Sequence, residues 1–413
     1  MGTTSKTVDR TFEQAVGLLK DNCVQRGMKA SVAYYNQVWA RDSFISFLGA
    51  NLLEDEGLLE CARRNVATFA RAVSPLGQVA NFYDLETRRP EFGYSGSTDS
   101  SCWFIIGVAN LYSTSRDSTL LQEPLEAAVK AYRWLRFQDA NNSWLIDSPQ
   151  GGDWMDAAVQ RTGKTLYNNT LFLMASKSID TLTQASGKPL ERHLRLDFPD
   201  LSQRFLDVFG PGDESPGRIA EYWPRYAAAL RSRIPEFPKG HLLQYVSFSR
   251  IDDRLDTFSN VLCILAGLCG PSKSRRILDE MRSRGLTDPF PSRVLDPPYR
   301  ADGAAYDRAF DATLPPQHRS TPLRYHNGAV WPFVGGAHVC SMYRVGISTA
   351  RGTLERLAGA NSVRRAGDRI GFNEWLHGRS GRAMGQCGQS WNAGMFVAAV
   401  RAAEGDHFLK FLS

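Results

Sequence analysis

Apolar residues recur at helical spacing along almost the whole of this 413-residue chain, and no other feature constrains its fold as strongly. Residues three and four positions apart, such as Phe12, Ala15, Val16 and Leu19, form a stripe that a helix must bury against a neighbour. No convincing series of alternating strands accompanies this pattern, so we predict an all-α protein. The expected helices, about a dozen, cover residues 12–19, 44–52, 58–73, 103–112, 124–137, 171–182, 224–233, 257–268, 274–284, 331–343, 350–360 and 391–403.

Several loops between these helices are long and rich in Gly, Trp, Asp and Asn. Examples cover residues 35–42, 151–156 and 325–332, and such loops recur at alternate helix junctions. Loops of this kind carry function when a rigid scaffold holds them. The pattern therefore predicts a ring of helical hairpins with polar and aromatic loops at one end.

The chain contains no flexible linker that would divide it into separate domains. Its length would allow two or three domains, but single barrels also reach this size, so we expect one domain over residues 1–413. The least regular stretch covers residues 185–245 and is rich in Pro, Arg and Asp. We interpret it as a lid or an insertion.

Composition excludes several classes of protein. The net charge is only +6 and no block of five or six like charges occurs, so nucleic-acid binding is not expected. The seven Cys are scattered without metal-ligand spacing and are typical of buried free thiols in a reducing compartment. The N-terminus lacks the apolar stretch of a signal peptide, and no apolar run approaches the length of a membrane span. We therefore expect a cytoplasmic protein without a membrane partner.

Six carboxylates stand at or beside loop–helix junctions, where each could contribute to chemistry. The alternative for any one of them is a structural role, because Asp before a helix is a common N-cap. Asp42 and Asp99, which precede helical segments, are open to that interpretation. The six are Asp42, Asp99, Asp153, Asp156, Asp256 and Glu374.

Glu374 and Asp156 differ from the other four in their neighbours. Glu374 lies between Asn373 and Trp375 in a loop bounded by Gly, and Asp156 follows Trp154 closely. An indole can desolvate a carboxyl and raise its pKa, which suits an acid that must hold its proton near neutral pH. Cleavage of a glycosidic bond needs such a pair, one acid for the leaving oxygen and one carboxylate on the opposite face. We therefore predict Asp156 and Glu374 as the catalytic residues of a glycoside hydrolase.

Other chemistries find less support in the sequence. No GxSxG elbow, P-loop or HExxH motif occurs. His326 and His377 are the histidines in motif-like loops, and they lack the close spacing of a metal site. They are expected to orient a substrate or to hold loops together. The sequence requires neither a metal nor an organic cofactor.

Seven motifs, in order along the chain, resemble segments of the (α/α)6-toroid glycosidases. The segments at 35–46, 77–82 and 154–164 are similar to those of amylo-α-1,6-glucosidases, the glucosidase module of glycogen debranching enzymes. Residues 98–103 resemble a segment of the alkaline/neutral invertases. The series is completed by Tyr325-His326-Asn327-Gly328 with Trp331-Pro332, by Phe372-Asn373-Glu374-Trp375, and by Gln389-Ser390-Trp391-Asn392-Ala393. The ordered set is specific for this superfamily and less specific for one member.

The resemblance implies a (α/α)6 toroid in which Asp156 is the general acid and Glu374 the general base. The chain departs from its relatives within Leu166–Asn169, where they commonly carry a Pro-Val-Glu or Pro-Leu-Glu segment. It also lacks their additional β-rich domains, so a small substrate is expected. The residues expected to line the sugar pocket are Arg41, Asp42, Asp99, Trp154, His326, Asn327, Gln389 and Trp391, with Trp331 and Trp375 from the same loops.

We therefore predict an exo-acting hydrolase of a short α-glucoside, either an oligosaccharide or a glucosyl conjugate. Inversion is expected from the resemblance to debranching enzymes, whereas the invertase-like motif leaves an invertase-like sucrose hydrolase as an alternative. A sugar isomerase or epimerase, which would use His as acid and base, and a catalytically inactive carbohydrate-binding protein are alternatives of other classes. The sequence does not fix the linkage, the leaving group or the oligomeric state.

Overall fold

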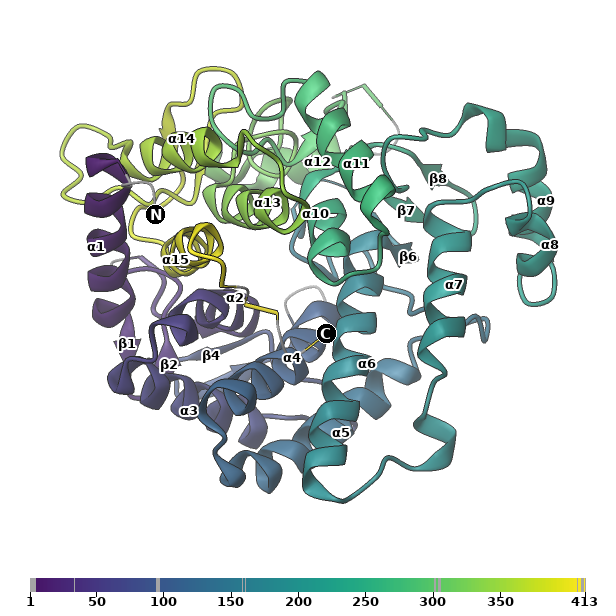
Figure 1. The fold of residues 1–413 in the computed structure, drawn as a ribbon, viewed down its shortest axis with the longest axis horizontal. Helices are drawn as coiled ribbons and strands as arrows, with labels where there is room; N and C mark the ends of the chain where they lie inside the picture. The colour runs from purple at the N-terminus through teal and green to yellow at the C-terminus, as the bar shows by residue number, and fades with distance from the viewer. Residues whose placement is uncertain are drawn as a thin grey trace.

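A closed ring of six helices forms the centre of the computed structural model (Figure 1). The model describes residues 5–32, 34–93, 97–157, 159, 161–300, 302–303, 306–406, 408–409 and 412. Within these ranges, each helix of the ring packs on the next along the chain, and the last packs on the first. The ring consists of α2 (Ala40–Ala50), α4 (Thr98–Ser115), α6 (Leu166–Ser186), α10 (Thr257–Leu265), α13 (Pro332–Val345) and α15 (Ser390–Ala403).

Six outer helices of the described chain surround this ring, one before each inner helix. Inner helices are buried on every side, as α2 is along its whole length, whereas outer helices bury one stripe and expose the other. The six hairpins confirm the predicted all-α (α/α)6 toroid. The outer helices are α1 (Lys6–Asp21), α3 (Glu56–Arg71), α5 (Glu123–Arg136), α7 (Phe198–Phe209), α11 (Pro271–Ser283) and α14 (Ala350–Ser362).

Residues 185–245 contain more regular structure than their composition suggested. The outer helix α7 lies there, followed by α8 (Ser215–Ile219) and α9 (Pro224–Arg233). The spacing of Leu201, Phe205 and Val208 gives α7 the apolar stripe that packs it on α6, although several Pro around it mask the pattern. In Figure 1, α8 and α9 lie at the outer edge of the molecule, beyond α7.

Short antiparallel strands connect the loops between hairpins, and several stand directly before an inner helix. β3 runs into α2, β6 into α6 and β9 into α10, so that these ladders fix where each inner helix begins. The strands are β1 (Cys23–Val24), β2 (Gly27–Met28), β3 (Gln37–Trp39), β4 (Phe82–Asp84), β5 (Arg89–Glu91), β6 (Lys164–Thr165), β7 (Tyr245–Val246), β8 (Ile251–Asp252), β9 (Leu255–Asp256), β10 (Leu295–Asp296), β11 (Trp375–Leu376) and β12 (Ala383–Met384).

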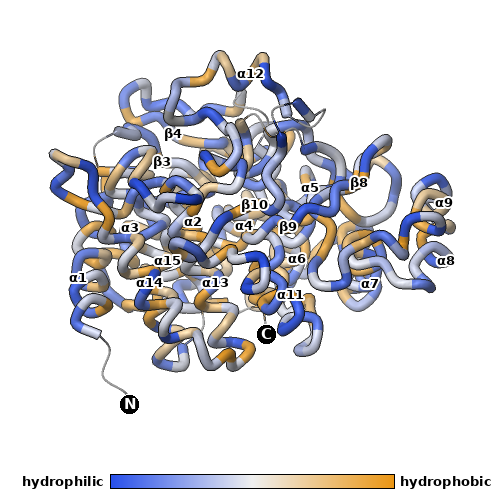
Figure 2. Tube along the Cα trace, turned by 90° about the horizontal axis from the view of Figure 1, so that it is seen from above, coloured by the Kyte–Doolittle hydropathy of each residue, from blue (hydrophilic) through white to orange (hydrophobic). Residues whose placement is uncertain are grey.

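Inner helices all begin at the same end of the ring, because an outer helix reverses the chain between each pair of them. Figure 2 shows β3, β4 and the short helix α12 (Arg308–Thr313) at this end. The loops that precede the inner helices therefore meet above the centre of the ring.

The seven cysteines are all free, and five of them are buried, with Cys23 and Cys387 half-buried. This agrees with the scattered thiols expected from the sequence. None of the described helices is both long and apolar enough to span a lipid bilayer.

The ring closes where α2 meets α15, and two glycines allow that approach. A Cβ on Gly394 would collide with the backbone of Ser46, and a Cβ on Gly49 would collide with the backbone of Gly394. Neither glycine has a positive φ, so the constraint is the space between the two helices rather than the backbone conformation.

We expect Gly394→Ala to lower the free energy of unfolding by about 1–3 kcal/mol, because the added methyl forces α2 and α15 apart. Gly17→Ala is the matched control, since Gly17 lies exposed within α1 with no atom near its Cβ position. That variant should gain about 0.5–1 kcal/mol from the higher helix propensity of Ala. Urea unfolding of both variants measures the difference, and equal effects would contradict this account of ring closure.

Candidate active site

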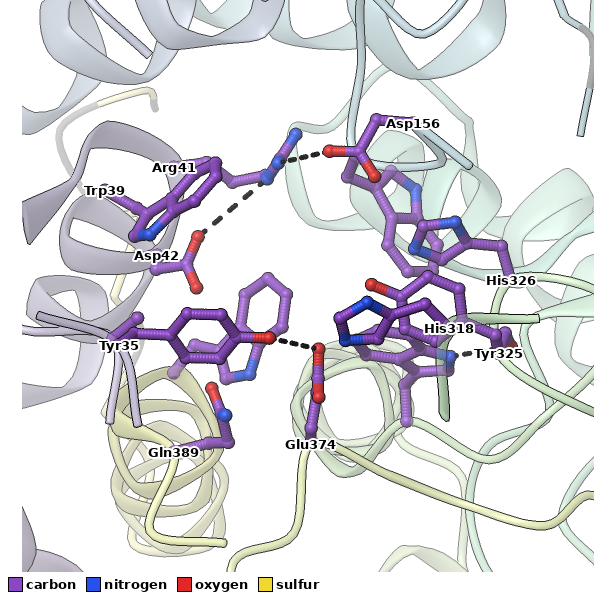
Figure 3. A pocket seen from close by; sticks show the side chains of 14 residues that line it. Tyr35, Trp39, Arg41, Asp42, Asp156, His318, Tyr325, His326, Glu374 and Gln389 are labelled. Atoms are coloured by element: carbon purple, nitrogen blue, oxygen red, sulfur yellow. Dashed lines mark hydrogen bonds and ion pairs between the residues drawn. The ribbon is translucent and has the colours of Figure 1, made fainter. Parts of the chain in front are cut away.

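A pocket of about 580 Å³, its open mouth included, lies where the loops before the inner helices converge (Figure 3). Its walls come from the segments before α2, α13 and α15, from the first turns of α2 and α15, and from the loop that carries Asp156. The lining residues are Ala30, Tyr35, Trp39, Arg41, Asp42, Trp154, Asp156, His318, Tyr325, His326, Trp331, Glu374, Gln389 and Trp391.

Aromatic rings form one wall of the pocket. The rings of His326 and Trp331 stack with centroids 5.2 Å apart and planes at 22°, and Trp154 meets both edge-on. Burial lowers the pKa of His326 well below its ordinary value, so its imidazole is neutral. Nε1 of Trp154, Nε1 of Trp391 and Nδ1 of His326 are buried without a hydrogen-bond partner among the described residues. A polar ligand in the pocket would satisfy these atoms.

Three carboxyl groups face the pocket, and burial is the first cause of a raised pKa in each. The pKa of Asp156 rises to about 6, and those of Asp42 and Glu374 rise to about 7. The positive charge of Arg41 opposes this rise for both aspartates. Their side chains remain partly accessible, 18% exposed for Asp156 and 11% for Asp42, so both can reach a bound ligand.

Arg41 connects the buried acidic groups on one side of the pocket. Its Nη1 donates to Oδ2 of Asp99 at 2.8 Å, and its Nη2 donates to Oδ2 of Asp156 at 3.2 Å. Asp99 is fully buried and also accepts a hydrogen bond from the hydroxyl of Tyr167 at 3.3 Å. The pair Asp99 and Tyr167 therefore fixes the guanidinium, and the guanidinium in turn fixes the carboxylate of Asp156.

Glu374 lies across the pocket from Asp156, at the end of the loop before β11 (Figure 3). Its Oε1 accepts a hydrogen bond from the hydroxyl of Tyr35, and its Oε2 accepts one from the backbone N–H of Gln386, both at 3.2 Å. Burial and the nearby Glu374 raise the pKa of Tyr35, which therefore keeps its proton and donates. Gly385 packs against the carboxyl at a position where a Cβ would collide with it. Both oxygens of Glu374 are thus held in a defined orientation.

Asp153 and Asp256 do not line the pocket, although both were candidates from the sequence. The side chain of Arg161, itself only 1% exposed, donates to Oδ2 of Asp256 at 2.6 Å and to Oδ1 of Asp153 at 2.9 Å. Asp256 caps α10, and Asp153 accepts the backbone N–H of Met155. Their role is to fasten the loop of Asp156 to the inner ring.

Nine of the twelve predicted site residues line the pocket, and the other three lie behind it. Asp99 is buried under Arg41, and the side chain of Asn327 bonds to the backbone of Tyr299 and Ser320. Trp375 is fully buried and packs edge-on against Tyr325. The nine are Arg41, Asp42, Trp154, Asp156, His326, Trp331, Glu374, Gln389 and Trp391.

The pocket also contains residues that were not predicted as site residues. Tyr35 and Trp39 stand in the first recognised motif, so that motif offered a signal for them. His318 and Tyr325 come from the segment 297–325, which contains α12. Tyr325 belongs to a recognised motif, whereas no sequence motif marked His318 as a site residue. Segment 185–245 contributes none of the described lining residues, and its role as a lid remains a prediction.

The chain resembles known proteins in sequence over most of its length. The profile of the amylo-alpha-1,6-glucosidase family matches residues 11–394. Two Arabidopsis thaliana proteins described as probable alkaline/neutral invertases D and F are 28% and 27% identical over 343 and 345 residues, or 76% of this chain. The chain spans 62% and 66% of the length of these relatives.

Solved structures with the same fold include two glycosidases. The GH63 mannosylglycerate hydrolase of Thermus thermophilus, in complex with glucose, gives a TM-score of 0.61 at 14% identity, covering 94% of this chain and 99% of that one. A bacterial glucoamylase complexed with acarbose gives 0.60 at 10% identity, covering 98% and 57%. At these identities the likeness shows the fold alone.

We expect Glu374→Gln to be more stable than the wild type above neutral pH. The folded protein holds the proton of Glu374 up to about pH 7, whereas an unfolded glutamate releases it near pH 4.5, so wild-type stability falls as pH rises between these values. Glutamine resembles the protonated form and does not incur this loss, so the variant should gain about 3 kcal/mol at about pH 8 and nothing at about pH 4. Urea unfolding over this pH range measures the difference.

Asp55→Asn serves as the control of opposite sign. Asp55 caps α3, and hydrogen bonding to Lys20 and to the backbone lowers its pKa, while asparagine preserves the cap. Its ionised form stabilises the fold, so this variant should lose stability relative to wild type as pH rises through the acid range. If the difference in unfolding free energy between Glu374→Gln and wild type did not change with pH, the pKa of Glu374 would not be raised in the folded protein.

Proposed function

The chain belongs to the amylo-alpha-1,6-glucosidase family, and we propose that it is a glycoside hydrolase that releases the terminal sugar of a short α-glucoside with inversion. The observation that supports this proposal most directly is the pair of carboxyl groups across one pocket. Asp156 and Glu374 face each other there, each with a pKa raised into the range of an acid–base pair.

The proposed reaction is a single displacement at the anomeric carbon. Glu374 takes a proton from a water molecule, whose oxygen bonds to the anomeric carbon from one face. The glycosidic C–O bond breaks on the opposite face, and the proton of Asp156 passes to the departing oxygen. Glu374 then holds the proton taken from water, while Asp156 is ionised and must recover a proton from solvent before the next cycle.

Neighbouring groups support these roles. The hydrogen bonds from Tyr35 and from the backbone of Gln386 stabilise the ionised form of Glu374 and orient it toward the water. Burial raises the pKa of Asp156, while its ion pair with Arg41 limits the rise to about 6. The reactive form of the pair carries one proton, on Asp156. Because the pKa of Glu374, about 7, lies above that of Asp156, about 6, this form is the less populated of the two singly protonated forms. Activity is lost when both groups are protonated or both are ionised.

The pocket also suits a sugar ring. Unpartnered indole N–H groups of Trp154 and Trp391 can donate to hydroxyl oxygens, and Asp42 can accept from hydroxyl groups. The aromatic wall offers flat apolar surface of the kind that packs on the C–H face of a sugar. A pocket of this form supports removal of one terminal residue.

An invertase-like activity on sucrose is the second candidate, supported by the two relatives that are 28% and 27% identical. The isomerase alternative finds less support, because burial keeps His326 neutral among aromatic rings with no carboxylate bonded to it among the described residues. An inactive binding protein would not need both Asp156 and Glu374 in the pocket.

We expect Asp156→Asn and Glu374→Gln each to reduce kcat/KM by about 10²–10⁴-fold, because acid–base groups contribute that much to catalysis. The assay is glucose release from sucrose, maltose, isomaltose, trehalose, glucosylglycerol and glucosylglycerate. Asp207→Asn is the matched control, since Asp207 is also buried and paired, with Arg218, but does not line the pocket. It should keep activity within about threefold of wild type. Activity within about tenfold of wild type in either catalytic variant would refute the assignment.

Stereochemistry tests the single displacement separately. Proton NMR of the first sugar released from the best α-linked substrate should show the β-anomer before mutarotation mixes the two forms. The physical reason is that water attacks from the face opposite the leaving group. Initial release of the α-anomer would instead indicate a covalent glycosyl-enzyme, with Glu374 or Asp42 as nucleophile.

A further inference from the structure

We propose that the pocket selects glucosides with an uncharged leaving group and rejects those whose leaving group carries a carboxylate or phosphate. This inference rests on the proposed function and specifies its substrate class. It follows from the charges that line the pocket and from the partners that each of them already has.

Arg41 is the one arginine or lysine among the described lining residues, against three carboxyl groups there. Its guanidinium is bonded to Asp99 and Asp156, and its Nε lies 4.0 Å from Oδ2 of Asp42. Asp99 is fully buried and cannot turn toward solvent or another partner. The positive charge of Arg41 is therefore compensated before any ligand binds.

The histidines of the lining supply no further positive charge. Burial lowers the pKa of both His318 and His326, and the positive charge of Arg41 lowers that of His326 further. Between residues 5 and 406, the positions that the structure does not describe carry Ala, Tyr, Ser, Gly or Gln in the sequence, so none of them adds a cation. The donors that remain for a ligand, the indole N–H groups of Trp154 and Trp391, are neutral.

Negative charge acts across the whole pocket. Asp42 and Asp156 act on Glu374 across the pocket, since their negative charges, after burial, raise its pKa. An anionic ligand would meet the same repulsion and would also lose its hydration. Like charges brought together in a binding site disfavour the complex strongly.

The position of the leaving group decides which of these charges it meets. In the proposed reaction Asp156 protonates the departing oxygen, so the leaving group must sit beside Asp156. Asp156 carries the proton that it donates, so the nearest charges to the leaving group are those of Asp42 and of the already compensated Arg41. Once the proton has passed, Asp156 is ionised as well and repels an anionic leaving group. A neutral polyol or sugar can bond to these groups through its hydroxyls, whereas a carboxylate cannot donate to them.

A matched pair of substrates tests the inference. Glucosylglycerol and glucosylglycerate differ in one group, a hydroxymethyl in the first and a carboxylate in the second. We expect kcat/KM to be at least about tenfold higher for glucosylglycerol near neutral pH. The same comparison is made with the best glucoside of the panel and a derivative that carries a carboxylate on its leaving group. Equal rates, or a preference for the anionic member of either pair, would overturn the inference.

Asp42→Asn tests the electrostatic cause. Removing one negative charge should reduce the ratio of kcat/KM between the neutral and the anionic substrate by at least about threefold, even if both rates fall. Asp207→Asn, outside the pocket, should leave the ratio unchanged. An unchanged ratio in Asp42→Asn would show that the carboxylates of the pocket do not cause the preference for the neutral substrate. Failure of the proposed function is a separate result, because then no glucoside of the panel would be hydrolysed at all.

Discussion

The ion pair between Arg41 and Asp99 is the interaction on which the pocket depends. A fully buried carboxylate such as Asp99 can remain ionised only beside a compensating charge, and a buried guanidinium has the same need. Because Asp99 lies in the first turn of α4 and Arg41 in the first turn of α2, the pair also joins two neighbouring helices of the ring. Asp156 then binds the outer side of the same guanidinium. The position of Asp156, the proposed acid, therefore depends on the buried ion pair between Arg41 and Asp99.

The ring explains why so many acidic groups can gather at one end. Every inner helix presents its N-terminus there, and the partial positive charge of a helix N-terminus stabilises carboxylates in the first turn. Asp42 and Asp99 occupy first turns, and Asp256 caps α10 through its side chain. The remaining electrostatic cost appears as the raised pKa values of Asp42, Asp156 and Glu374. Burying these carboxyl groups lowers the stability of the folded protein, and it also brings their pKa values near neutral pH, where acid–base catalysis needs them.

Much of this arrangement could be predicted from the sequence, because helical periodicity and loop motifs are local signals. All twelve expected helices exist, and α9 begins and ends where predicted, at Pro224 and Arg233. Pairings between distant residues could not be predicted in the same way. In the sequence, nothing distinguished Asp153 and Asp256 from Asp42 as candidate site residues. In the structure, Arg161 donates hydrogen bonds to both Asp153 and Asp256. His318 enters the pocket from a segment without regular spacing, so only the folded chain reveals it.

The segment Leu166–Asn169, where the sequence departs from the debranching-enzyme pattern, contacts the charged groups of the pocket through Tyr167. A Glu in this segment would add another carboxylate to a region where Asp42, Asp99 and Asp156 already share one arginine. Tyr167 of this segment donates its hydroxyl to Asp99, which stabilises that carboxylate without adding charge. Trp103 donates to the same hydroxyl at 2.8 Å and fixes its orientation. This segment therefore adds no further anion beside Arg41, whose positive charge limits the rise of the pKa of Asp156 to about 6.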